Sequence, residues 1–89
     1  MRRGIMIFNV LEQEWEIWIG QQSYGVFEGM FFELRIQNRY YQASLGKDKD
    51  DDWFVTLENE VTFDLRHFEV YKVRTTTIEL NILFENAPF

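Results

Sequence analysis

Apolar and polar residues alternate along most of this chain, and this alternation constrains the fold more than any other feature. The clearest run spans 76–84, where one face carries Ile78, Leu80, Ile82 and Phe84. Shorter runs of the same kind occupy 5–8, 15–19, 32–36, 41–45 and 53–57. Side chains along a strand point alternately to two faces, so this period predicts half-buried β-strands. No window of 11 residues has the apolar spacing of an amphipathic helix.

Turn residues divide these runs at short intervals. Residues 9–13, 37–38 and 58–59 can each form a turn, and 21–28 reads as a looser connection between strands. The segment 64–68 predicts a single helical or 3₁₀ turn, because Asp64 can accept hydrogen bonds from the amides that follow it. Short strands separated in this way predict an all-β fold. We expect a small SH3-like barrel or two-sheet sandwich of six or seven short strands with one short 3₁₀ turn.

Length and composition predict a single cytoplasmic β domain over residues 1–89. A chain of 89 residues matches one domain, and 46% hydrophobic residues with 18% aromatic residues supply its core. There is no cysteine, so packing rather than disulfides must hold the fold together. The apolar run 5–10 is too short for a signal peptide, and no run reaches the ~18 residues of a membrane span.

Charge points to a protein partner with a basic surface. The net charge is −6, which argues against direct binding to the phosphates of a nucleic acid. The strongest local feature is "GKDKDDDW", residues 46–53, which predicts an acidic loop between two strands. Its carboxylates would repel one another and do not favour a strand, so we expect them to attract a partner's Lys and Arg residues. The candidate partner-binding residues in this loop are Asp48, Asp50, Asp51 and Asp52, and Glu58 and Glu60 either join them or lie at the opposite end.

The same acidic residues do not predict a metal site. Asp48-x-Asp50-x-Asp52 resembles the start of a calcium loop, but Trp53 occupies the position where that loop needs a glycine. We therefore expect no metal and no cofactor. We also expect no enzymatic activity, because the chain has no cysteine and a single histidine, His67. Its neighbours Leu65 and Phe68 indicate a packing role for that histidine.

Aromatic residues offer a second kind of binding surface. Tyr40 and Phe54, with Tyr41 and Trp53, would form a shelf beside the acidic loop, as in grooves that hold proline-rich basic peptides. The alternative is that Tyr41 and Trp53 belong to the core and that the other two are scattered on the surface.

Part of the chain resembles small uncharacterised SH3-like proteins of Firmicutes and their phages and mobile elements. The resemblance covers residues 29–74 and rests on Gly29-x-x-Phe32-Glu33-Leu34, Tyr41 to Leu45, Asp52-Trp53-Phe54-Val55 and Glu69 to Arg74. It implies an SH3-like barrel and a phage or mobile-element setting, and no particular activity. In size, acidity and lack of cysteine the chain is also similar to small phage inhibitors such as anti-CRISPR proteins.

These observations favour a non-enzymatic acidic binding protein that inhibits a host nucleic-acid enzyme by occupying its basic surface. An anti-CRISPR protein acting on a Cas nuclease is the sharpest form of this hypothesis. The alternative is an SH3-like adaptor or structural module that binds a peptide or assembles with itself. The last strand carries few charges, so we also expect a homodimer through Thr76–Phe84 unless this segment pairs with 5–10 of the same chain.

Overall fold

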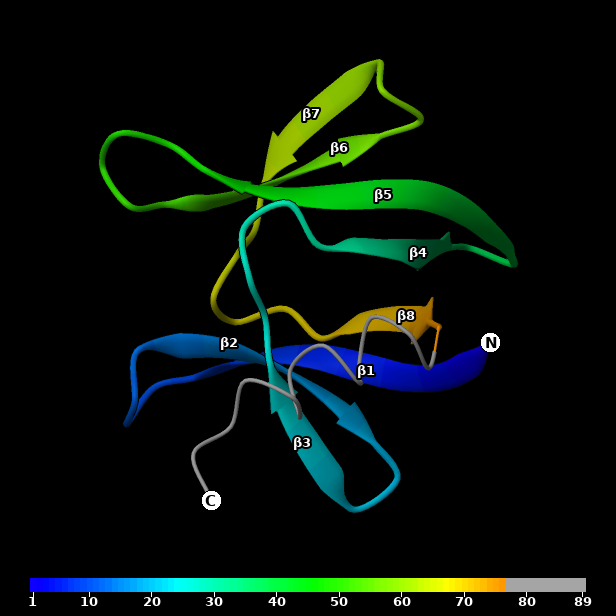
Figure 1. Cartoon of the computed structure of the whole chain (residues 1–89), viewed down its shortest axis with the longest axis horizontal. Coiled ribbons are helices and arrows are strands. Elements are labelled where there is room, and N and C mark those ends of the chain that lie inside the picture. The colour runs from blue at the N-terminus through cyan, green and yellow to red at the C-terminus, as the bar shows by residue number, and fades with distance from the viewer. Residues whose placement is uncertain (77–89) are drawn as a thin grey trace.

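The computed structural model describes residues 1–76, which form eight antiparallel strands and contain no helix. The strands belong to one sheet with the order β3-β2-β1-β8-β4-β5-β6-β7 (Figure 1). Their bounds are β1 Arg2–Asn9, β2 Glu14–Ile19, β3 Gln22–Gly25, β4 Phe31–Ile36, β5 Arg39–Lys47, β6 Trp53–Leu57, β7 Val61–Asp64 and β8 Tyr71–Thr75. The all-β prediction is confirmed, with more strands than the six or seven expected.

Within residues 1–76 the sheet is open, so neither a closed barrel nor a sandwich of two separate sheets describes it. β3 and β7 form its two ends and do not pair with each other. β8 joins the two halves, because it pairs with β1 along one edge and with β4 along the other. Figure 1 shows β1, β2 and β3 on one side of β8 and β4, β5, β6 and β7 on the other.

Both halves of the sheet contribute to one core, and the period-two pattern identifies most of it. Trp15, Ile17 and Ile19 lie on the buried face of β2, as the alternation predicts. Buried side chains from six other strands and from the connections complete the same core, namely Met6, Tyr24, Met30, Phe32, Leu34, Ala43, Leu45, Val55, Leu65 and Val73. Ile36 continues the pattern of β4 but is 40% exposed, because it precedes the turn at 37–38.

Two predictions of local structure are wrong. Residues 22–25 form β3 instead of a loose connection, since Gly20 turns the chain at φ 62° and Tyr24 pairs with Ile17 and enters the core. Residues 64–68 do not form a 3₁₀ turn. The Leu65 amide donates to the Trp53 carbonyl (3.1 Å), which extends the β6–β7 pairing, and one β-turn follows from the Glu69 amide to the Arg66 carbonyl (3.1 Å).

Apart from Thr76, the predicted C-terminal strand and the homodimer through Thr76–Phe84 lie outside the described residues. β1, the other predicted partner of that segment, lies between β2 and β8. Residues 1–76 include no helix long and apolar enough to cross a membrane.

Candidate binding site

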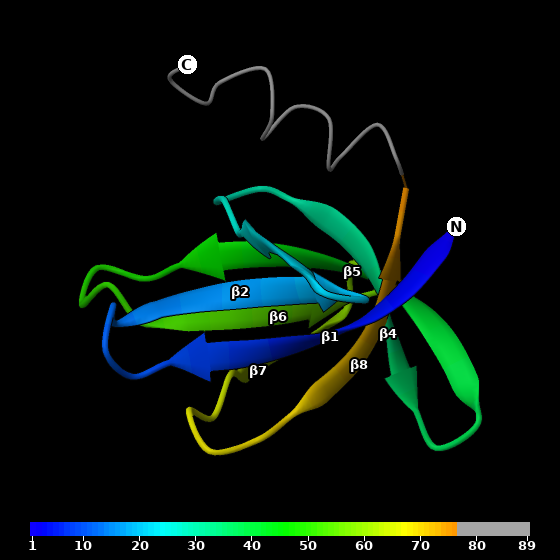
Figure 2. The same ribbon diagram turned by 90° about the horizontal axis from the view of Figure 1, so that it is seen from below.

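Three loops lie at one end of the sheet, which we call the loop end. They are residues 10–13 between β1 and β2, 48–52 between β5 and β6, and 65–70 between β7 and β8. Figure 2 shows all three connections at the same end of the molecule. β5 and β7 both finish beside the start of β6, and residues 65–70 carry the chain from there to the start of β8, beside the end of β1. Loops carried on a rigid sheet are the usual place for binding residues.

Asp48 holds the acidic loop in shape. Its Oδ1 accepts hydrogen bonds from the amides of Asp50 (2.8 Å) and Asp52 (3.0 Å). Its own amide donates to the Asp52 carbonyl (2.9 Å), and its carbonyl accepts from the Asp51 amide (3.1 Å). This carboxylate therefore satisfies the loop backbone, which is a structural role, and its contact with a partner stays a prediction.

The other three carboxylates of the loop are free to meet a partner. Asp50, Asp51 and Asp52 are exposed, and within residues 1–76 their side chains make no hydrogen bond and no ion pair. Asp51 has a positive φ of 63°, which points to a tight turn at the tip of the loop. The loop therefore presents unpaired negative charge at the end of the β5–β6 hairpin.

Trp53 stands at the centre of the loop end. It is half-buried, and the Nζ of Lys47 lies 5.0 Å from its ring centroid. A hollow of about 340 Å³ lies on one side, between the indole, Lys47 and residues 12–14. A second hollow of about 360 Å³ lies on the other side, walled by Asp52, Asp64 and residues 65–68. The indole thus separates two hollows that are each bordered by carboxylates, and a cation already lies near its ring.

Stacked rings fix the loop 65–70 against β1. His67 lies parallel to Phe8, with ring centroids 3.9 Å apart and an interplanar angle of 4°. Trp15 contacts both rings from the core side, at 5.4 Å from Phe8 and 6.0 Å from His67. The Tyr71 hydroxyl accepts a hydrogen bond from the Arg66 amide (2.8 Å). His67 therefore has the packing role that we predicted, although its partners come from β1 and β2 rather than from its neighbours.

The loop end also exposes large apolar side chains. Leu11 is 95% exposed and Phe68 is 80% exposed, and Val10 and Val70 are exposed as well. The Phe8–His67 stack brings the loops that carry them close together. Apolar side chains beside free charges are the combination that protein interfaces use, with the apolar groups providing the buried centre.

The remaining predicted residues lie elsewhere. Phe54 lies one residue along β6 from Trp53, and its ring covers Gly46, where an added Cβ would meet it. Glu58 and Glu60 lie in the turn at the far end of β6, roughly 20 Å from Asp52 at about 3.3 Å per residue. Glu58 there accepts a hydrogen bond from the Gln42 amide (2.9 Å).

Tyr40 is also at the far end, so the predicted aromatic shelf is divided. The Arg74 guanidinium lies 4.0 Å above its ring and pairs with the Glu33 carboxylate, Nε to Oε1 at 2.6 Å. Tyr40 and Phe54 therefore do not form one surface. The roles of Tyr40, Phe54, Glu58 and Glu60 in binding a partner stay predictions.

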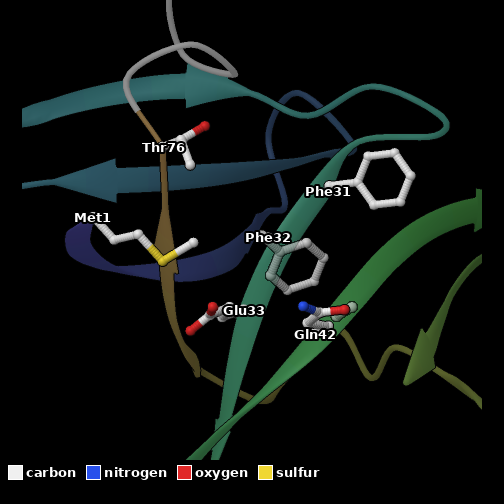
Figure 3. A pocket seen from close by; sticks show the side chains of 7 residues that line it. Met1, Phe31, Phe32, Glu33, Gln42 and Thr76 are labelled. Carbon is white, nitrogen blue, oxygen red and sulfur yellow. The ribbon is translucent and has the colours of Figure 1, made fainter. Parts of the chain in front are cut away.

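A third hollow of about 250 Å³ lies away from the loop end, where β4, β5 and the N-terminus meet (Figure 3). Phe31 and Phe32 are successive residues of β4 and point to opposite faces, so Phe31 is 64% exposed while Phe32 enters the core. Among the described residues that line it, the one carboxylate is Glu33, which is already paired with Arg74. This hollow is therefore poorly suited to a basic partner.

Lys47 is the feature that sequence reasoning missed, whereas Trp53 was expected either in the core or on an aromatic shelf beside the acidic loop. Their adjacency in the pattern "GKDKDDDW" was the available signal, since both flank the acidic loop. Among residues 1–76, no group of three or more His, Asp or Glu residues is placed to hold a metal ion. Comparison with protein-family models, curated proteins and solved structures found no match for this chain.

Proposed function

We propose that this protein is a non-enzymatic binding protein whose loop end receives a basic surface of another protein. The observation that carries the proposal is the half-buried Trp53 between two hollows, beside the free carboxylates of Asp50, Asp51 and Asp52. A partner's Arg or Lys side chain can place its methylene groups in a hollow and its charge beside a carboxylate. Exposed Leu11 and Phe68 would supply apolar contact at the same end.

The partner class that we favour is an enzyme that binds nucleic acid. The phosphate-binding surface of such an enzyme is rich in Arg and Lys, and an acidic loop competes for it through the same charge attraction. In this proposal the protein acts in the cytoplasm as a phage or mobile-element inhibitor, and an anti-CRISPR protein against a Cas nuclease is its sharpest form. The net charge of −6 supports rapid encounter with such a surface.

The alternative function is an SH3-like adaptor for a basic peptide. It depends on a shelf of neighbouring aromatic rings, and in residues 1–76 the rings predicted for that shelf lie apart. Such a groove needs adjacent aromatic rings, and Tyr40 is engaged with Arg74 at the far end of the sheet. The relationship to SH3-like proteins also stays a prediction, because the sheet is open between β3 and β7.

A matched pair of variants tests the proposal. Asp50→Asn with Asp51→Asn removes two charges from the loop end, and Asn tolerates the positive φ at 51. Glu58→Gln with Glu60→Gln removes two charges from the far end, and Gln at 58 keeps the oxygen that accepts from the Gln42 amide. Immobilised wild-type and variant proteins are incubated with host lysate, and the bound proteins are quantified by mass spectrometry at low and high salt.

We expect a protein that the wild type and the far-end variant retain, and that the loop-end variant loses by about tenfold or more. Added salt should release it from the wild type, because exposed charges are screened. Its identity then tests the partner class, since the purified partner should lose nucleic-acid binding when the protein is added. Equal retention by both variants would reject the loop end as the binding site.

A further inference from the structure

The edge of the sheet at β7 offers unpaired backbone groups. β7 has no neighbour on its outer side among residues 1–76. The bond from the Leu65 amide to the Trp53 carbonyl makes these two residues a hydrogen-bonded pair. Such pairs alternate along an antiparallel ladder, so Val55↔Phe63 and Leu57↔Val61 are hydrogen-bonded as well. The N–H and C=O groups of Thr62 and Asp64 therefore point away from β6 toward the free edge.

Of the two edge strands, β7 is better suited than β3 to pair with a strand of another molecule. Val61 is exposed, Phe63 is half-buried, and β7 contains neither Lys nor Pro, two residues that often protect an edge strand. Beside the strand lies an open hollow of about 570 Å³, lined by Phe63, Tyr71 and neighbouring charged residues. β3, at the opposite edge, has Tyr24 as its single large apolar side chain, and that side chain is buried.

We infer that β7 pairs with β7 of a second copy of this chain, in antiparallel orientation about a two-fold axis at Phe63. Three symmetric registers would join the outward-facing residues. Asp64 opposite Asp64 of the second copy places like charges face to face, which is unfavourable. Thr62 opposite Thr62 brings Glu60 opposite Asp64, which is unfavourable for the same reason. The remaining register sets Thr62 opposite Asp64 on both sides of the axis.

This third register is complementary along its whole length. The Thr62 hydroxyl can donate to the Asp64 carboxylate of the second copy, and the backbone groups of both residues exchange hydrogen bonds. Continued beyond the strand, the register brings Glu60 opposite Arg66 of the second copy. On the axis, the two Phe63 rings meet in a non-hydrogen-bonded pair, where opposing side chains are closest. A two-fold axis repeats each of these contacts.

The association is weak and strengthens with salt. Four-residue strands bury much less than the roughly 1,600 Å² of a standard interface, so we expect a dissociation constant on the order of 0.1–1 mM. Each copy carries a net charge of −6, and salt screens the repulsion between copies. Binding of a basic partner at the loop end has the opposite salt dependence, so the two events are separable.

Amide exchange and sedimentation of the full 89-residue chain test this inference. Between about 10 μM and 1 mM, sedimentation should show a monomer–dimer equilibrium. Exchange measured by NMR should slow with concentration at the Thr62 and Asp64 amides and stay constant at the Ser23 and Gly25 amides of the other edge. A chain that remains monomeric at about 1 mM would overturn the inference. So would a dimer without this protection, such as one formed only through Thr76–Phe84.

Variants at Thr62 test the register. Thr62→Lys places a cation opposite Asp64 and should tighten the dimer about threefold or more, whereas Thr62→Asp should weaken it by a similar factor. If the edge strands instead paired in no fixed register, Lys at position 62 should weaken association, because Lys ordinarily protects edge strands from pairing. Thr62→Pro removes an outward N–H, keeps the β6 pairing and should abolish the dimer, whereas Ser23→Pro on β3 should not. If both charge variants weaken the dimer, the register is wrong.

Discussion

Thr75 is a polar residue in the apolar core. Its side chain is 0% exposed, and its hydroxyl has no hydrogen-bond partner among residues 1–76. A buried hydroxyl without a partner loses the hydrogen bonds that it makes to water in the unfolded chain. Thr75→Val keeps the branched shape and removes this cost, so we expect the free energy of unfolding in urea to rise by about 1 kcal/mol.

Val73 provides the control, two residues earlier on the same face of β8. Val73 is also 0% exposed, and Val73→Thr buries a hydroxyl where there was none, so it should lower the free energy of unfolding by about 1–3 kcal/mol. A loss of stability in Thr75→Val would show that the hydroxyl has a partner in solution.

At the scale of the element, the β5–β6 loop depends on one of its four aspartates. Asp48→Ala removes the acceptor for two backbone amides and should lower the free energy of unfolding by about 1 kcal/mol, measured by urea denaturation. Asp48→Asn keeps an acceptor oxygen and should retain most of that stability. Asp50→Ala should change it by less than about 0.5 kcal/mol, because this side chain is exposed and unpaired within residues 1–76. Equal losses at positions 48 and 50 would contradict the capping role of Asp48.

Strands were predictable from the sequence where one face is buried and the other is exposed to solvent. β2 and β6 show this pattern, with Ile17 and Val55 at 0% exposure between more exposed neighbours. β3 was missed because Gln22–Gly25 offers one large apolar residue and no visible alternation. The turn prediction at 64–68 failed because the capping signal of Asp64 is local, whereas the bond between Leu65 and Trp53 is a tertiary contact.

In the candidate site, too, local features were predictable from the sequence and tertiary arrangement was not. The acidic loop was predictable because four aspartates stand in one short segment. The placement of this loop at the same end as residues 10–13 and 65–70 depends on the pairing order of the strands, which the local pattern does not contain. The sequence also left open whether Glu58 and Glu60 join the acidic loop. The structure answers this, because β6 lies between them and places them at opposite ends of the strand.

At the scale of the whole molecule, the two ends of the sheet differ in how their charges are used. At the far end, Glu33, Arg74 and Tyr40 satisfy one another, and Glu58 holds the Gln42 amide. At the loop end, Asp50, Asp51 and Asp52 remain unpaired within residues 1–76, and Leu11 and Phe68 are exposed at the same end. Binding capacity is therefore concentrated at one end, and the open edge at β7 provides a separate surface for self-association.

In the proposed function, a partner binds at the loop end. The most direct test is amide hydrogen exchange of the protein alone and in complex with the protein that the loop-end variant fails to retain. Amides covered by a partner exchange more slowly, so we expect slower exchange in residues 10–13, 48–53 and 65–70, with residues 37–42 and 58–60 unchanged. Slower exchange at 37–42 and 58–60 with no change in the three loops would contradict it.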